Sequence, residues 1–206
     1  MARSKSSSRW LREHFNDPYV KRAQSEGWRS RAVFKLEELL GGERLIEPGM
    51  VAVDLGAAPG GWSQMLRRQM GSRGRIIALD VLPMQGIAGV EFIQGDFRED
   101  VVSSRLQNLL GGDKVDLVLS DMAPNMSGVG VADQARAMYL AELARDFAAE
   151  HLRPGGAFIV KLFQGRDFDD FIKDLRNAYL RVSMRKPKAS RSRSAEVYAL
   201  AKGKRE

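Results

Sequence analysis

The sequence contains no cysteine. This absence excludes disulfide bonds, thiolate metal sites and a cysteine nucleophile, and it favours a reducing compartment, for which we expect the cytoplasm. Histidine is almost absent as well, with two residues among 206. His14 lies in a basic segment and His151 at the end of an expected helix, so neither indicates a catalytic role.

Long hydrophobic runs are also missing. No run approaches the roughly 20 apolar residues that cross a membrane, and the first 30 residues contain no apolar signal-peptide segment. We therefore expect no membrane association. The Arg- and Ser-rich start weakly resembles an organelle transit peptide. Its aromatic residues favour instead a segment that docks on the rest of the protein, namely Trp10, Phe15, Tyr19 and Trp28.

Positive charge is concentrated at the two ends of the chain. Residues 1–35 contain nine Lys or Arg against three acids, residues 181–206 contain nine against two, and the net charge is +7. If both ends fold onto one face, they form a track for a nucleic acid, with salt-sensitive binding and aromatic surfaces for base stacking. Two solvated tails that only aid solubility are the alternative.

The stretch from Val51 to Trp62 predicts a strand, a glycine-rich turn and a helix. Val51–Leu55 is an apolar run of strand length, and a helical pattern covers 62–70. This is the first unit of a doubly wound α/β domain, in which a nucleotide-like ligand lies over the turn. Gly56, Gly60 and Gly61 allow the backbone to approach such a ligand.

Acidic residues at strand ends indicate the kind of ligand. The second strand ends at Asp80, 20 residues after Gly60, where a carboxylate can bind the ribose of an adenosine-type cofactor. Neither a G-x-G-x-x-G turn nor a triphosphate-binding G-x-x-x-x-G-K-[ST] motif is present. Asp54 before the turn and Asp96 after the third strand suit a cofactor with a cationic centre, so S-adenosylmethionine fits best.

We expect one α/β domain, because 206 residues are hardly enough for two. The basic, partly disordered arm is expected at 1–30 and the domain at 31–206. Strands are expected at 51–55, 74–79, 90–94, 115–120, 156–162, 180–186 and 195–201. Helices are expected at 62–70, 99–110, 133–152 and 167–178, with an additional short one near Met84–Ile87 and another that Ser30 caps and that runs to Leu40. Such alternation predicts a Rossmann-like, mostly parallel sheet with the first and fourth strands adjacent. The last two strands are too close for a helical crossover, so a C-terminal antiparallel hairpin is expected.

Two residues at the ends of apolar strands are candidates for catalysis. The strand before Asp121 delivers this carboxylate to the ligand side of the sheet, although an Asp there can also merely cap a loop. Lys161 lies inside an apolar strand, where an ammonium group is costly without a partner; a lysine whose head reaches solvent is the alternative. Lys35 and Glu196 are weaker candidates by themselves, since each could lie on a solvated face.

Seven stretches of the chain match a known family. They are Ser8-Arg-Trp-Leu-Arg-Glu-His-Phe15, Arg29-Ser-Arg-Ala-Val-Phe-Lys-Leu36, Asp54-Leu-Gly-Ala-Ala-Pro-Gly-Gly-Trp-Ser-Gln64, Gly95-Asp-Phe-Arg98, Ser120-Asp-Met-Ala-Pro-Asn-Met-Ser-Gly128, Val160-Lys-Leu-Phe-Gln-Gly165 and Arg193-Ser-Ala-Glu-Val-Tyr198. From about Ser6 to Ala201 the chain resembles the RrmJ/FtsJ (RlmE) family of S-adenosylmethionine-dependent ribosomal RNA 2′-O-methyltransferases.

The resemblance implies site residues. The family's catalytic Lys-Asp-Lys-Glu set falls on Lys35, Asp121, Lys161 and Glu196. The cofactor-binding residues that it implies are Gly60, Trp62, Asp80, Asp96 and Asp121, and no metal is implied. In this hypothesis Lys161 contacts the 2′-oxygen or accepts its proton, Asp121 holds Lys161, and the other two residues fix the lysines and the substrate ribose.

The implied reaction is methylation of the ribose 2′-hydroxyl of a uridine in the large-subunit (23S) ribosomal RNA, on the assembled large subunit. A monomer is the default expectation for the oligomeric state. A base N-methyltransferase would need an Asn/Asp-Pro-Pro-aromatic turn after the fourth strand, and Asp121-Met-Ala-Pro124 is not one. A small-molecule methyltransferase would have less reason for basic ends. An assembly factor that only binds RNA would not need all four catalytic residues.

Overall fold

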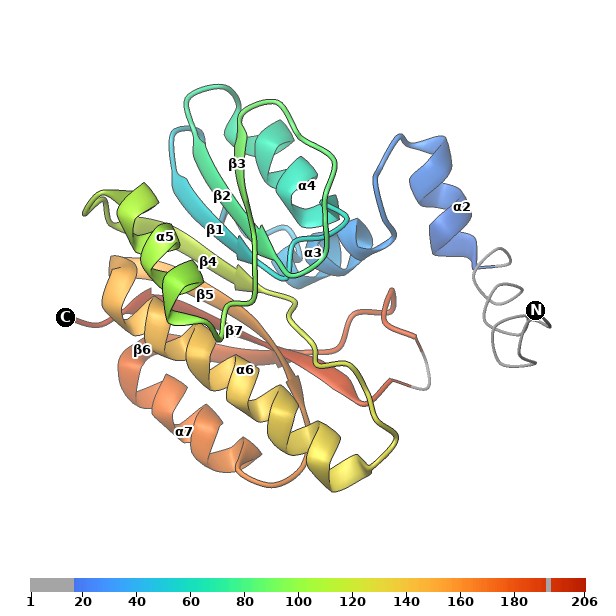
Figure 1. The fold of residues 1–206 in the computed structure, drawn as a ribbon, viewed down its shortest axis with the longest axis vertical. Helices are drawn as coiled ribbons and strands as arrows, with labels where there is room; N and C mark the ends of the chain where they lie inside the picture. Colours follow the sequence, from blue (N-terminus) through green and yellow to red (C-terminus); the bar gives the residue numbers. More distant parts are fainter. Residues whose placement is uncertain (1–16, 192–193) are drawn as a thin grey trace.

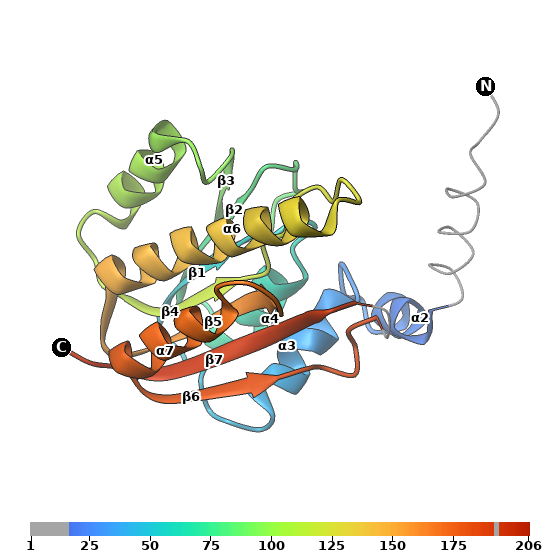
Figure 2. The same cartoon turned by 90° about the horizontal axis from the view of Figure 1, so that it is seen from below.

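The computed structural model describes residues 17–191 and 194–206, which form one seven-stranded sheet covered by helices on both faces (Figures 1 and 2). The strands are β1 (Val51–Leu55), β2 (Arg75–Asp80), β3 (Val90–Gln94), β4 (Val115–Ser120), β5 (Leu152–Phe163), β6 (Tyr179–Arg185) and β7 (Glu196–Lys204). The helices are α2 (Pro18–Ser25), α3 (Ala32–Leu40), α4 (Gly61–Met70), α5 (Asp100–Leu110), α6 (Gly130–His151) and α7 (Phe168–Ala178).

The strand order is β3-β2-β1-β4-β5-β7-β6. Strands β1 to β5 are parallel to one another, whereas β7 is antiparallel to both β5 and β6. The predicted mostly parallel sheet, the contact between the first and fourth strands and the antiparallel C-terminal hairpin are therefore confirmed. The position of β7 between β5 and β6 was not predicted. It matters because β7 lies directly beside the strand that carries Lys161.

Two apolar layers, one on each face of the sheet, make up the core. One layer joins the sheet to α5, α6 and α7, and the other joins it to α3 and α4. Successive side chains of β1 point to opposite faces of the sheet and so contribute to both layers. Val53 and Leu55 belong to the first layer, and Ala52 belongs to the second. Burial on both faces explains why these strands are almost continuously apolar.

Residues 17–30 pack against the domain. Ala23 is buried in the α3/α4 layer, and Tyr19 and Trp28 pack against that layer. The Arg31 guanidinium contacts both the Asp17 carboxylate and a backbone carbonyl of the β6–β7 connection. The first part of the expected arm, residues 1–16 with Trp10 and Phe15, lies outside the described residues.

Two local predictions were wrong. Ser30 does not cap α3: Arg31 occupies the N-cap position, and the Ser30 hydroxyl packs against Gly61 of α4 without a hydrogen-bond partner among the described residues. Met84–Ile87 is not helical. The carbonyl groups of Gln85 and Gly86 accept hydrogen bonds from the Arg29 guanidinium instead, which fixes an irregular connection.

Candidate active site

The predicted catalytic residues come from four different elements and meet at the carboxyl ends of the central strands. Lys35 lies on α3, Asp121 follows β4, Lys161 is on β5 and Glu196 begins β7. The Asp121 amide donates to the Leu55 carbonyl at 2.9 Å, so the chain leaving β4 stays attached to the end of β1. The adjacency of β1 and β4 therefore determines where this carboxylate lies.

A continuous series of polar contacts joins these side chains. The Lys35 ammonium pairs with Glu196 at 2.6 Å and donates to the Tyr198 hydroxyl at 3.2 Å. That hydroxyl donates to Oδ1 of Asp121 at 2.7 Å, and the Lys161 ammonium donates to the same oxygen at 3.0 Å. The structure thus brings all four predicted residues together and adds Tyr198 as the connecting group.

Tyr198 is a residue that sequence reasoning did not identify. It lies opposite Lys161 in the antiparallel β5–β7 ladder and two residues after Glu196, on the same face of β7. Its presence in the matched stretch Arg193–Tyr198 was the available signal. Only the pairing of β7 with β5 shows which neighbours its hydroxyl reaches.

The network is buried and its charges compensate one another. Lys161 and Glu196 are each 8% exposed, and Tyr198 is fully buried. Burial by itself would raise the pKa of Asp121, but the ammonium groups of Lys161 and Lys35 outweigh it and hold that pKa below its usual value. Burial and the Asp121 carboxylate raise the pKa of Tyr198 far above its usual value, so its hydroxyl remains a hydrogen-bond donor.

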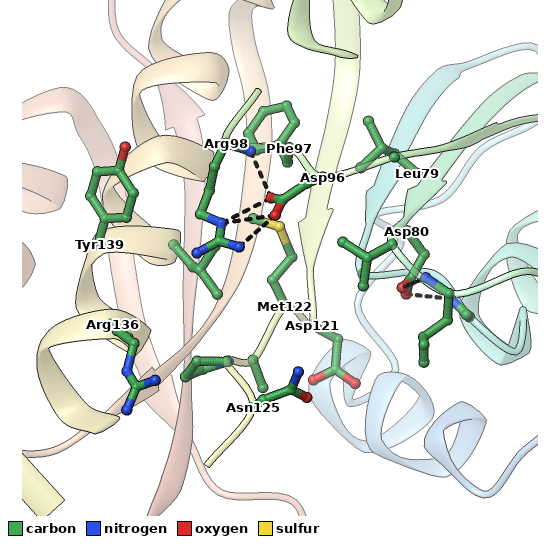
Figure 3. A pocket seen from close by; sticks show the side chains of 18 residues that line it. Leu79, Asp80, Asp96, Phe97, Arg98, Asp121, Met122, Asn125, Arg136 and Tyr139 are labelled. Carbon is green, nitrogen blue, oxygen red and sulfur yellow. Dashed lines mark hydrogen bonds and ion pairs between the residues drawn. The ribbon is translucent and has the colours of Figure 1, made fainter. Parts of the chain in front are cut away.

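A cavity of about 470 Å³ opens on the Asp121 side of this network. Three carboxylates from the ends of successive strands line it, namely Asp80, Asp96 and Asp121, and apolar side chains including Leu79 and Met122 form its walls (Figure 3). The Asp80 carboxylate accepts hydrogen bonds from the amides of Ala58 and Leu82, each at 2.8 Å.

Asp96 follows β3, the strand beside β2 and Asp80, and its carboxylate binds the Arg98 side chain (Figure 3). The hydrogen bonds from Arg98 lower the pKa of Asp96, although burial opposes this shift. The cavity therefore presents carboxylate oxygens from three strand ends together with apolar side chains.

Asp54 lies on β1, two residues before Gly56, which lines this cavity. It is fully buried, one carboxylate oxygen accepts from the Ser63 hydroxyl at 2.6 Å, and the other oxygen has no partner among the described residues. Burial, with the nearby charges of Asp121 and Asp80, raises the pKa of Asp54 to about 7. A cationic group bound in the cavity would favour the ionised form of this carboxyl.

The structure does not place the side chains of all predicted cofactor residues in the cavity. Trp62 is 3% exposed, and its indole nitrogen donates to the Ala32 carbonyl at 2.7 Å. Its ring packs against Tyr198, with 6.0 Å between the ring centroids. Gly60 faces Met84, whose sulfur would lie 2.8 Å from a Cβ at this position. Contact of Gly60 or Trp62 with a cofactor would have to involve their backbone, and it remains a prediction.

A second cavity, of about 490 Å³, lies at the other end of the network. Its lining includes Lys35 and Glu196 together with the cationic side chains of Arg31 and Arg191. The polar network therefore connects an acidic cavity, which contains Asp121, to a cavity with a basic rim.

The model of the family described as FtsJ-like methyltransferase matches residues 28–204. The chain belongs to this family. Ribosomal RNA large subunit methyltransferase E from Stenotrophomonas maltophilia (strain K279a) is 66% identical over 203 residues, which cover 98% of this chain and 97% of the relative. The protein of the same name from Xanthomonas campestris pv. campestris (strain B100) is 63% identical over 204 residues, covering 99% and 97%.

Solved structures agree with this membership of the FtsJ-like family. A putative ribosomal RNA methyltransferase from Plasmodium falciparum is 28% identical, with a TM-score of 0.76 over 86% of this chain and 98% of that one. Aeropyrum pernix fibrillarin, solved with natively bound S-adenosyl-L-methionine, shares the fold, with 19% identity and a TM-score of 0.57 over 82% and 75%. The family and the methyltransferase fold that the sequence predicts are confirmed, whereas the role of each site residue remains a prediction.

Proposed function

We propose that this protein transfers a methyl group from S-adenosylmethionine to the ribose 2′-hydroxyl of a uridine in large-subunit ribosomal RNA, on the assembled subunit. The observation that carries the proposal is the buried network of two lysines, two carboxylates and Tyr198 at the inner end of an acidic cavity. The names of the 63–66% identical relatives support ribosomal RNA of the large subunit as the substrate.

The acidic cavity fits S-adenosylmethionine. Asp80 ends β2, where a carboxylate can bind the two ribose hydroxyls, and Asp96 follows the adjacent strand β3, where it can contact the adenine. The carboxylate of Asp121 lines the cavity and provides negative charge for a sulfonium cation. The buried Asp54 carboxyl adds negative charge where it ionises. When bound, this cofactor supplies a methyl group that is activated by the positive sulfur.

Lys161 acts on the 2′-hydroxyl in the proposed reaction. Its ammonium group hydrogen-bonds the 2′-oxygen and stabilises the negative charge that grows there as the hydroxyl proton passes to solvent water. Asp121 holds Lys161 in place through the 3.0 Å contact. Lys35 and Glu196 line the basic-rimmed cavity, where they can position the ribose. Much of the rate acceleration comes from alignment of the reacting atoms.

RNA reaches the site from the basic-rimmed cavity. Arg191 carries a guanidinium group that can bind a phosphate beside the methylated nucleotide. Arg31 adds positive charge to this cavity, while its guanidinium group is held by Asp17 and the Ala189 carbonyl. All members of the catalytic network belong to one chain, which supports action as a monomer. The absence of cysteine and a ribosomal substrate support a cytoplasmic location.

Transfer of labelled methyl groups to unmethylated large ribosomal subunits tests the proposal. Wild-type protein should give an alkali-resistant labelled dinucleotide, because a methylated 2′-oxygen cannot attack the adjacent phosphate. Lys161→Ala should abolish the label while leaving cofactor affinity by calorimetry nearly unchanged, since the lysine contacts the substrate oxygen. Lys173→Ala, on an exposed face of α7, is the matched control. An alkali-labile product, or wild-type turnover in Lys161→Ala, would contradict the proposed reaction.

A further inference from the structure

The segment that follows Asp121 is held by one buried carboxylate. Asp133, in the first turn of α6, is 5% exposed. Its two oxygens accept hydrogen bonds from the Ser127 amide at 2.8 Å, the Ser127 hydroxyl at 2.7 Å and the Gly128 amide at 2.9 Å. Arg136 adds a contact to the same carboxylate at 2.8 Å and a second one to the Ser127 hydroxyl. These contacts fix the backbone of a connection that contains no helix or strand of its own.

The fixed segment, Asn125–Val129, lies at the edge of the acidic cavity. Asn125 lines that cavity, and its side chain lies beside Asp121 in Figure 3. Met126 and Val129 are each 61% exposed. A single exposed apolar side chain is ordinary, but these two belong to a segment whose shape is already determined by Asp133. The prearranged segment that borders the acidic cavity at Asn125 therefore presents two apolar side chains to solvent.

The same turn of α6 also holds the connection after β5. The Gln134 side chain donates to the Arg166 carbonyl at 2.8 Å, and a Cβ on Gly165 would lie 2.2 Å from the Gln134 amide nitrogen. Consequently Asp133 and Gln134 fix the two connections that leave β4 and β5. These are the strands that deliver Asp121 and Lys161. The first turn of α6 therefore fixes the two connections that follow these residues.

We propose that Asn125–Val129 is a preformed nucleobase lip that receives an unpaired base of the RNA substrate, and that Asp133 is its positioning residue. The inference rests on the proposed function: a ribose at Lys161 and Asp121 brings its own or a neighbouring base to a segment that begins four residues after Asp121. Unpaired bases are recognised by packing on apolar faces and by amide contacts to their edges. Met126 offers an adaptable apolar face, and Asn125 offers the amide.

Steady-state kinetics on large ribosomal subunits tests the lip. Asp133→Asn replaces one accepting oxygen by an NH2 group that faces donors, so the segment should lose its fixed shape. We expect the KM for subunits to rise by about tenfold, with kcat within about twofold and unchanged cofactor affinity, since a loss of uniform substrate binding affects KM alone. Met126→Ala should raise the same KM by about threefold to tenfold. Asp146→Asn and Val131→Ala, both exposed on α6, are controls that should leave KM unchanged.

A double-mutant cycle distinguishes positioning from general damage. If Asp133 acts through the lip, the Asp133→Asn/Met126→Ala double variant should have nearly the KM of Asp133→Asn alone, because the contact is already lost. Multiplied effects, or an unchanged KM in folded Asp133→Asn, would overturn the proposal. If Asp133→Asn melts near the assay temperature, Ser127→Ala removes one donor and takes its place. An alkali-labile wild-type product would refute the 2′-hydroxyl as acceptor and leave the KM comparison interpretable.

Discussion

At the scale of single residues, the Tyr198 hydroxyl couples the two lysines of the site. It accepts a hydrogen bond from Lys35 and donates one to the carboxylate oxygen that also binds Lys161. Trp62 packs against the Tyr198 ring and so helps to hold it in place. A residue outside the predicted catalytic set therefore contributes to the position of Asp121.

Tyr198→Phe should slow the reaction without weakening cofactor binding. The substitution keeps the buried ring and removes both hydrogen bonds. A hydrogen bond to a charged group contributes about 1.5–3 kcal/mol, and each 1.36 kcal/mol corresponds to about tenfold in rate. We therefore expect kcat to fall by about tenfold or more, measured by single-turnover methyl transfer. Tyr179→Phe, at a buried tyrosine in the other core layer, is the matched control. Equal kcat values for the two variants would remove Tyr198 from the network.

At the scale of elements, the turn between β1 and α4 fits closely against the chain that leaves β4. Gly56 has a φ of 79°, in the region that favours glycine. A Cβ there would lie 2.7 Å from the Met122 amide nitrogen and 3.0 Å from the Asp121 carbonyl carbon. Both neighbours are backbone atoms, which cannot move aside as a flexible side chain can. The glycine therefore allows β1 and β4 to bring their ends together at the site.

Gly56→Ala should destabilise the protein and displace Asp121. Backbone strain together with overpacking costs on the order of 3 kcal/mol, which corresponds to a fall in Tm of about 6–12 °C for a domain of this size. Differential scanning calorimetry measures the change. Gly86→Ala is the control, because nothing lies within 4 Å of a Cβ there and its φ is not positive. A Gly56→Ala protein with wild-type Tm and activity would show that the contact does not constrain the turn.

At the scale of the whole molecule, Asp54 links stability to pH. Its pKa is raised from 3.8 to about 7 in the folded protein, chiefly by burial. Between these two values the unfolded chain releases a proton that the folded protein retains. The contribution of Asp54 to stability therefore falls as pH rises from about 4 to about 7, by at most about 4 kcal/mol on a value of 1.36 kcal/mol per pH unit.

Asp54→Asn should remove this part of the pH dependence. Urea unfolding at several pH values between 4.5 and 7.5 measures it as the difference between wild-type and variant. Burial lowers the pKa of His151, which makes stability rise with pH below about 6.5, opposite in sign to the effect of Asp54. Because His151 is present in both proteins, its contribution cancels in the difference. A difference that does not change with pH would show that Asp54 is already ionised in the folded state.

The sequence by itself determined the strands and the chemistry at their ends. Apolar runs bounded by turn residues are local signals, so β1, β3 and β4 have the predicted bounds. Parallel strands then place Asp80 and Asp121 at one edge of the sheet, because their carboxyl ends meet there. The four catalytic candidates could be selected because the matched motifs distinguish Lys35 and Glu196 from ordinary surface charges.

Only the tertiary structure decided which groups touch. The insertion of β7 between β5 and β6 brings Tyr198 opposite Lys161. Trp62 lies in the core rather than in the cavity, and Asp133 binds a segment that the sequence leaves without an assigned structure. These outcomes depend on strand order, on helix packing and on backbone donors left free in a connection. Strand order and helix packing depend on residues that are distant in sequence, and the free backbone donors lie outside regular elements. Periodicity and spacing in the sequence do not report on either.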